Sequence, residues 1–443
     1  MYINKRRFIY RDIYRSMWPL YLISKCLGLA PYCYISEDKN KTFRTSYPSI
    51  LYTWLMVLLI GVCFIISISA RMTWVYPTVK ITTTVADVLI LCSIVFSAIT
   101  TLVLSLIKTR KAIDTILKQI TDIDSQILTT PKTVYLKTKL LLSLQIICIF
   151  CALAFLYCYD CLVWVKTFGY RNMYYIVSYL VFTINYIMNL QFVYFVLLLM
   201  HRFKRLNSLV TENGMYSNIS CKQQLIDSII PSRTANRTNR TSEANDSNVS
   251  FSDPCRVINA EKSASLVPSV TLLKPQQKFF KLRVLHDTLC DVLVLVNDIY
   301  GFPILVDIAT TFINITTYLY FCLYYTLHLH SYDSEQINIG HMLSLHLFWL
   351  LLYALKIVCI SVSCHCASLE ASRTGVLIQK LLLMHDWDIK CVNELKAFDR
   401  QLQPRQLRFT AYDFFQLDLS LLCSIAGAVT TYLVILLQFE ISN

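Results

Sequence analysis

The chain has 443 residues, of which 55% are hydrophobic and 16% charged, and it carries a formal net charge of +13. A water-soluble domain of this size cannot hide so much apolar surface in a core, so the composition indicates a membrane protein. With only eight glycines and eleven prolines, the chain favours long helices over a β-barrel.

The N-terminal segment, residues 1–48, is basic and has no apolar run that ends at a signal cleavage site, so we expect it to remain in the cytosol. Seven apolar runs of about 20 residues or more follow it. These runs predict an all-α membrane protein with seven transmembrane helices at Ile50 to Ala70, Thr83 to Leu106, Leu140 to Val165, Tyr174 to Met200, Phe302 to Leu329, His341 to Val362 and Leu419 to Phe439.

The distribution of basic residues predicts the orientation of these helices. All but five of the 41 lysines and arginines lie in segments that face the cytosol if the N-terminus is cytosolic, as positively charged loops generally do. The five exceptions are Arg71, Lys80, Lys166, Arg171 and Lys356. The protein is therefore expected in the plasma membrane with its C-terminus extracellular. This placement explains the positive charge without a nucleic-acid partner.

One pattern favours the opposite orientation. Glycosylation triplets occur in the loop between the fourth and fifth helices, at Asn218, Asn236, Asn239, Asn245 and Asn248. A modified loop would have to be extracellular. Its thirteen lysines and arginines oppose translocation, and we therefore keep it in the cytosol.

The chain order predicts six regions. They are a cytosolic segment (1–48), helices 1–4 with cytosolic extensions (49–203), a long and partly disordered cytosolic loop (204–284), helices 5 and 6 (285–365), cytosolic anchor helices (366–416) and helix 7 (417–443). Apolar residues at helical spacing continue the second and sixth helices beyond the membrane. Such stripes need a partner, either a bundle within the chain or a neighbouring subunit.

The seventeen cysteines do not form a recognisable disulfide or metal framework. Most lie in apolar segments or in loops assigned to the cytosol, where thiols stay reduced. Cys364-His365-Cys366 and the pair Cys158 and Cys161 have partial metal-ligand spacing, but no second pair of ligands lies nearby in the sequence. No metal or other cofactor is expected.

The last predicted helix carries small and polar residues on one face. Their spacing of three and four stacks them along the helix axis. They are Ser424, Ala428, Thr431, Ile435 and Gln438. Such a stripe either packs against other helices or lines water.

Residues of this helix also carry a family resemblance. The stretch from Thr431 to Phe439 reads Thr-Tyr, five apolar residues, then Gln-Phe, which resembles the signature of insect gustatory receptors. The stretch Tyr21 to Tyr32 is similar to the start of their fructose-receptor branch. Asn297 with Tyr300-Gly301, and Cys364-His365, also resemble the family. The long cytosolic loop is not matched.

The resemblance implies a ligand-gated, nonselective cation channel in the plasma membrane that forms a homotetramer and passes monovalent and divalent cations. It places Gln438 and Phe439 at the gate, with Thr431 and Ile435 lining the pore. A G-protein-coupled receptor is the alternative receptor class. It would have an extracellular N-terminus, and its Asp-Arg-Tyr and Asn-Pro-X-X-Tyr motifs do not occur in this chain.

A sugar or polyol ligand needs an aromatic surface and several hydrogen-bonding groups. The extracellular halves of the predicted helices offer seven candidates: Asp87, Tyr175, Tyr325, His328, His346, Trp349 and Tyr353. An unpaired carboxylate is costly inside a membrane, which marks Asp87 as a functional candidate. The aromatic residues could instead form an interfacial belt, and the histidine could be a hydrogen-bonded core residue.

The resemblance narrows the ligand further. The fructose-receptor branch has an aromatic residue at the position of Tyr175, an acid at Asp87 and a tryptophan at Trp349. This chain has Tyr175 where tryptophan is expected and His346 where glutamine is expected. These departures make myo-inositol an alternative to fructose.

A transporter and a membrane enzyme are the alternatives to a receptor. A transporter could use Asp87, Asp307 and Lys356 as a charge relay within the membrane, but the sequence lacks the internal repeats of most transporters. A membrane enzyme would need a cluster of catalytic side chains on one membrane face, which the sequence does not predict.

Overall fold

The computed structural model describes residues 2–36, 41–78, 81–127, 131–168, 176–229, 274–328, 336–384, 387–405 and 407–442. The chain divides into two compact units. Unit 1 comprises residues 1–206, 285–373 and 406–443, and unit 2 comprises residues 207–284 and 374–405.

The described chain is almost entirely helical. In chain order, the long helices are α1 (Tyr2–Cys26), α2 (Tyr47–Trp74), α3 (Ile81–Leu104), α4 (Arg110–Ile127), α5 (Pro131–Phe168), α6 (Ile176–Ile229), α7 (Pro275–His328), α8 (Gln336–Leu382), α9 (Ile389–Leu402) and α10 (Ser420–Ser442). A short 3-10 turn, η1 (Tyr76–Thr78), follows α2, and a π-helical turn, η2 (Ser105–Thr109), joins α3 to α4.

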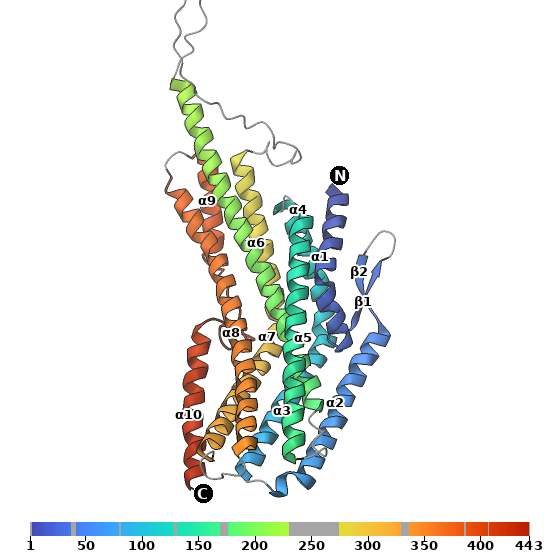
Figure 1. The fold of residues 1–443 in the computed structure, drawn as a ribbon. Coiled ribbons are helices and arrows are strands. Elements are labelled where there is room, and N and C mark those ends of the chain that lie inside the picture. Colours follow the sequence, from blue (N-terminus) through green and yellow to red (C-terminus); the bar gives the residue numbers. More distant parts are fainter. Residues whose placement is uncertain are drawn as a thin grey trace, which may run out of the picture. The chain divides into compact units, whose positions relative to one another are not determined.

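Six helical segments are long and apolar enough to cross a membrane: Tyr47–Trp74, Ile81–Lys108, Thr133–Lys166, Ile176–Met215, Pro275–Thr326 and Ile339–Leu382. They contain four of the first six predicted spans completely, and they cover the other two, Tyr174 to Met200 and Phe302 to Leu329, except for two residues at the start of the former and three at the end of the latter. The seventh predicted span falls in α10, whose described apolar stretch, Ser420–Leu436, is shorter. The start of α1 and the end of α10 lie at opposite ends of unit 1 (Figure 1).

The sequence did not predict the hairpin that follows α1. Strands β1 (Tyr32–Ser36) and β2 (Lys41–Thr45) pair antiparallel, with Tyr32 opposite Thr45. Before it, Gly28 ends α1 with a φ of 76°, a left-handed conformation that glycine adopts without a steric penalty. The carbonyl of Gly28 then accepts a hydrogen bond from Thr53 Oγ1 of α2 at 2.8 Å.

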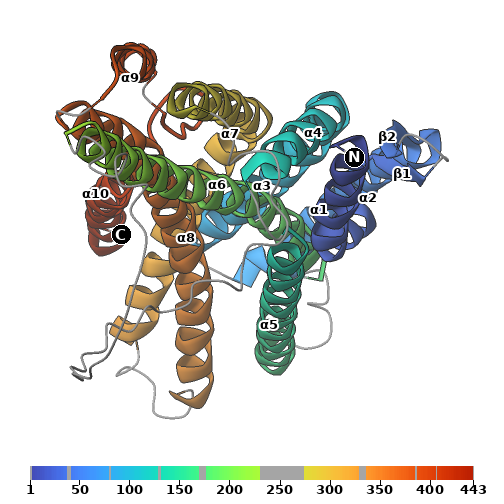
Figure 2. The ribbon, with the colours of Figure 1, turned by 90° about the horizontal axis from the view of Figure 1, so that it is seen from above.

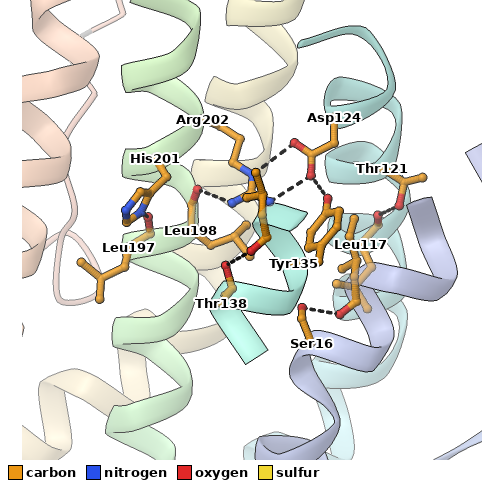
Figure 3. A network of polar contacts seen from close by, with 12 residues as sticks. Ser16, Leu117, Thr121, Asp124, Tyr135, Thr138, Leu197, Leu198, His201 and Arg202 are labelled. Atoms are coloured by element: carbon orange, nitrogen blue, oxygen red, sulfur yellow. Dashed lines mark hydrogen bonds and ion pairs between the residues drawn. The ribbon is translucent and has the colours of Figure 1, made fainter. Parts of the chain in front are cut away.

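A buried ion pair joins α4 to α6 within unit 1 (Figure 3). The guanidinium of Arg202 binds both carboxylate oxygens of Asp124, with Nη2 2.9 Å from Oδ2 and Nε 3.2 Å from Oδ1. The hydroxyl of Tyr135, near the start of α5, donates to the same carboxylate. Asp124 is fully buried and the Arg202 side chain is 8% exposed. Around them, the predicted apolar stripe of α4 is buried, including Ile116 and Ile120.

Unit 2 is a small helical bundle made from the end of α6, the start of α7, the end of α8 and α9. Its core contains Leu381, Leu395 and Phe398 from the stripe that extends the sixth predicted span. Arg283 and Glu394 form an ion pair across the unit at 3.1 Å. A bundle within the chain therefore accounts for these apolar residues. Residues 204–229 and 275–284, predicted as parts of a loop, are helical, whereas Ser232 to Ser252 lie outside the described residues.

Candidate ligand-binding site

A cavity of about 130 Å³ lies within unit 1, where α2 ends, α3, α6 and α8 begin, and α7 ends. One buried water molecule needs roughly 10–15 Å³ of cavity volume. If each non-hydrogen atom of a ligand needs about as much, the cavity has room for a ligand of about ten such atoms. Its polar lining residues include Arg71, Tyr76, Thr83, Thr84, Asp87, Asp160, Ser178 and His346. Most of the remaining lining is aromatic or aliphatic.

Asp87, predicted as an unpaired carboxylate, is paired. Its Oδ2 lies 2.6 Å from Nη1 of Arg71 at the end of α2, and it accepts a second hydrogen bond from the Tyr76 hydroxyl at 2.9 Å. The Arg71 side chain is 2% exposed, although the sequence placed it in a loop. Burial, followed by the negative charge of Asp87, raises the pKa of Tyr76, so this tyrosine stays protonated and donates.

A second carboxylate, Asp160 of α5, lines the same cavity and was not among the sequence candidates. The hydroxyl of Tyr179 donates to its Oδ2 at 2.5 Å, and Nε1 of Trp164 donates to its Oδ1 at 3.0 Å. Asp160 is 4% exposed. It lies inside the third predicted span, so the rule that identified Asp87 could also have identified Asp160.

Aromatic rings form one wall of the cavity around Trp349. The ring of Tyr318 is nearly parallel to that of Trp349, with an interplanar angle of 5° and centroids 6.2 Å apart. Phe182 of α6 meets Trp349 edge to face at 5.0 Å. Trp349 is 8% exposed, so packing fixes its orientation. The flat faces of such rings suit the C–H surface of a sugar ring or an aromatic ligand.

His346 joins this wall one helical turn before Trp349. Its Nδ1 lies 2.6 Å from the carbonyl oxygen of Met342 in the same helix. Because a carbonyl only accepts, Nδ1 carries the hydrogen and Nε2 of the neutral ring is left as an acceptor. The ring also packs against Phe321 and Tyr325, with centroid distances of 5.0 and 5.3 Å. His346 can therefore accept a hydrogen bond from a hydroxyl or amine.

The comparison with known families decides the class of the protein. The family described as 7tm Chemosensory receptor matches residues 18–443, nearly the whole chain. The chain belongs to this family. It is a multi-pass membrane receptor of the insect gustatory type rather than an enzyme.

Individual relatives of the receptor agree with this assignment. It is 29% identical over 177 residues to "Putative gustatory receptor 28a" of Drosophila melanogaster, covering 40% of this chain and 39% of the relative. It is 28% identical over 171 residues to the Drosophila "Gustatory receptor for bitter taste 66a", covering 38% and 32%. The chain thus matches less than half the length of these curated relatives.

The fold of the receptor is similar to that of a solved olfactory receptor. The structure of OR5 from Machilis hrabei in complex with eugenol has a TM-score of 0.56 to this chain at 15% identity, covering 99% of both chains. At this level of identity the similarity concerns the fold alone.

The receptor brings four of the seven predicted ligand-binding residues together around the cavity. These are Asp87, Tyr325, His346 and Trp349. Tyr353 does not line the cavity. It lies behind the wall, 1% exposed, with its ring 6.4 Å from that of Trp349. Tyr175 and the side chain of His328 lie outside the described residues.

The residues predicted to line a pore lie on α10, at the edge of unit 1 opposite α2 (Figures 1 and 2). Val429 of α10 is buried, and Tyr432 meets Phe312 of α7 edge to face at 5.6 Å. Thr431, Ile435 and Gln438, by contrast, are exposed within the chain. The side chain of Phe439 lies outside the described residues. Val429 thus packs on its own chain, whereas Thr431 and Ile435 are exposed.

Proposed function

We propose that the receptor is a ligand-gated, nonselective cation channel opened by a sugar or polyol such as fructose or myo-inositol. The observation that carries this proposal is the cavity beside Trp349, which combines an aromatic wall with Asp87, Asp160, Arg71 and the acceptor nitrogen of His346. Aromatic faces would contact the C–H side of the ligand ring, and the polar groups would bind its hydroxyls. The volume of the cavity suits a single ring rather than a disaccharide.

We further propose that four copies of the chain surround one pore, with the cytosolic N-terminus and extracellular C-terminus predicted from charge. The exposure of Thr431 on α10 supports this arrangement, because this polar residue would otherwise face lipid. Gln438 and Phe439 would then form the gate near the extracellular mouth.

The functional test is electrophysiology on cells that express this chain alone, with fructose, myo-inositol, glucose and sucrose as ligands. The proposal expects a current that needs no added G protein. Uptake of the solute without current would instead support a transporter, and a response that depends on G protein would support the other receptor class.

The cavity also favours a second class of ligand. It contains two carboxylates and one guanidinium, so it has an excess of acidic groups among aromatic rings. Organic cations are attracted to such surroundings, and one relative is named for bitter taste. The screen should therefore include a tetraalkylammonium salt and an alkaloid beside the sugars.

Trp349→Ala tests the cavity itself. It removes the centre of the aromatic wall, so the ligand concentration for half-maximal current should rise about tenfold if stacking contributes about 1.4 kcal/mol. Phe348→Ala is the matched control, because Phe348 precedes Trp349 on the same helix but is 42% exposed and does not line the cavity. Equal dose-response curves for both variants, at equal surface expression, would refute the cavity as the ligand site.

Asp160→Asn should also reduce the current, while keeping an acceptor for the Tyr179 hydroxyl. Asp87→Asn removes the partner of the buried Arg71 charge, so we expect reduced surface expression as well. A normal current in Asp160→Asn would show that this carboxylate does not contact the ligand.

Gln438→Ala tests the pore. The relative permeability of Na⁺ and Ca²⁺, or the current without ligand, should change. The reason is that the substitution removes the four Gln438 amide groups, one from each subunit, that would surround the pore at the gate. Leu436→Ala, on the opposite side of α10, is the matched control. If Gln438→Ala changes neither quantity, the gate lies elsewhere.

A further inference from the structure

A lane of buried polar side chains runs between α3, α6, α7 and α8 inside unit 1. On α7, Asp307, Thr310 and Asn314 share one face, and on α6, Asn185 and Asn189 lie one turn apart. All five are less than 5% exposed. The ligand cavity uses none of them. Their function is therefore a separate question.

The outer end of this polar lane meets the floor of the ligand cavity. Nδ2 of Asn185 donates to the carbonyl oxygen of Ile94 at 3.1 Å, and Ile94 lines the cavity. On the neighbouring residue of α3, the hydroxyl of Ser93 accepts from Nδ2 of Asn314 at 3.2 Å. The polar lane therefore begins where the cavity ends.

The other end of the polar lane is a buried ion pair. Nζ of Lys356 lies 3.0 Å from Oδ1 of Asp307, with the two side chains 5% and 1% exposed. Nδ2 of Asn189 donates to the second carboxylate oxygen of Asp307 at 2.9 Å. The ammonium carries three hydrogens, and Asp307 is its one hydrogen-bond acceptor among the described residues.

Several buried acceptors on the helices that form the polar lane have no partner among the described residues. They are the amide oxygens of Asn185, Asn189 and Asn314, the hydroxyl oxygens of Ser97 and Thr101, which follow Ser93 on α3, and the hydroxyl oxygen of Tyr353, whose ring centroid lies 5.1 Å from Nζ of Lys356. Each belongs to a residue that is at most 4% exposed. An isolated atom of this kind can be tolerated, but six on these four helices cost far more than a native core normally accepts.

The donors and acceptors of the polar lane indicate which molecule could form the missing hydrogen bonds. The unfilled positions include amide oxygens, which only accept, hydroxyls, which do both, and ammonium hydrogens, which only donate. Water is both donor and acceptor, and buried waters typically make about three hydrogen bonds each to groups of this kind. A metal cation is disfavoured because the Lys356 ammonium already neutralises Asp307.

We propose that a column of bound water fills the polar lane between α3, α6, α7 and α8, from the floor of the ligand cavity to the Asp307–Lys356 ion pair. The water links the cavity and the ion pair into one hydrogen-bonded network. It also lets the four helices shift slightly against one another without leaving polar groups unpaired, because water can change partners. The proposal does not depend on which ligand the receptor binds.

Radiolytic hydroxyl-radical labelling of the purified full-length receptor tests the column, because the radicals form from water beside the labelled side chain. Tyr353 and Phe195 are both 1% exposed, but only Tyr353 lies beside the polar lane. After normalisation to the unfolded protein, the column predicts that Tyr353 is labelled at least about fivefold faster than Phe195, since buried water lies next to it. Equal rates would overturn the proposal.

A pair of substitutions tests whether the asparagines hold the water. Asn185→Leu with Asn314→Leu keeps the approximate volume and removes the two amides nearest the cavity, so the rate for Tyr353 should fall towards that of Phe195. Asn213→Leu, on the part of α6 that belongs to unit 2, should leave it unchanged. Unchanged labelling of Tyr353 in the folded double variant would also overturn the proposal. If the double variant does not fold, the wild-type comparison decides.

Discussion

The buried contact between Asp124 and Arg202 gives the sharpest prediction for stability. Asp124→Asn removes the negative charge and leaves the guanidinium buried without its counter-ion. Breaking a buried ion pair in this way costs about 3–5 kcal/mol, because the remaining charge has neither water nor partner. The loss should fall within this range, since both carboxylate oxygens bind Arg202 and Tyr135 also donates to Oδ2.

Thermal unfolding in detergent, followed by fluorescence size-exclusion chromatography, measures this effect. With about 2–4 °C of melting temperature per kcal/mol in a large domain, Asp124→Asn should lower the melting temperature by at least about 6 °C. The double variant Asp124→Leu with Arg202→Met removes both charges. It should regain much of the stability that Asp124→Asn loses, because no buried charge remains. Lys118→Met on the same helix is the control, since the Lys118 side chain is 53% exposed and its ion pair with Asp114, one helical turn away, contributes only about 0.3–0.5 kcal/mol. The reasoning is refuted if Asp124→Asn is no worse than Lys118→Met, or if the double variant is less stable than the single one.

Two further predictions concern the start of α10 and the contact of the preceding loop with α7. Hydrogen bonds from Ser420 lower the pKa of Asp418, so the contribution of this cap, about 0.5–2 kcal/mol, is present above about pH 4 and fades as the pH falls below it. The melting temperatures of wild type and Asp418→Ala should therefore differ at pH 7 and converge in acid, and a difference that grows in acid would contradict the assignment. In Gly301→Ala, the new Cβ would lie 3.0 Å from the backbone nitrogen of Tyr412, and the forced shift should destabilise the protein by about 1–3 kcal/mol. Gly61→Ala meets nothing within 4 Å and should be neutral or slightly stabilising, so equal melting temperatures for the two glycine variants would exclude a close approach at Gly301.

Hydropathy predicts the location of six membrane helices well because lipid imposes a simple requirement on each span, namely length and low polarity. The family was identified from short motifs in α10 and α1, and the match over residues 18–443 confirms it. The hairpin β1–β2 escaped prediction. It follows a glycine-terminated helix and lies in a segment whose composition resembles that of the neighbouring loops, so the sequence carries no strong period-two signal there.

Part of the candidate site could be predicted because polar and charged residues stand out within an apolar span. Trp349, His346 and Asp87 are unusual residues for a membrane span, and each can be noticed singly. The pairing of Asp87 with Arg71 could not be predicted, because it depends on how α2 and α3 pack. Tyr353 was placed in the site on helical spacing alone, whereas packing turns it behind the wall.

Three ion pairs give charged residues within these helices a structural role. Arg71 and Asp87 join α2 to α3, Asp124 and Arg202 join α4 to α6, and Lys356 and Asp307 join α8 to α7. Each pair neutralises itself and fixes a helix contact, so these charges support the structure whether or not a ligand binds.

Asp160 is different. Its hydrogen-bond donors, Tyr179, Trp164 and Trp349, are neutral, and it forms no ion pair among the described residues. A carboxylate held in place by neutral donors at the wall of a cavity keeps its charge available to a ligand, either as an acceptor for a hydroxyl or as a counter-ion for an amine. The choice between a polyol and an organic cation therefore depends mainly on Asp160. If Asp160→Asn preserved the response to a polyol but abolished the response to a tetraalkylammonium salt, this carboxylate would act chiefly as a counter-ion.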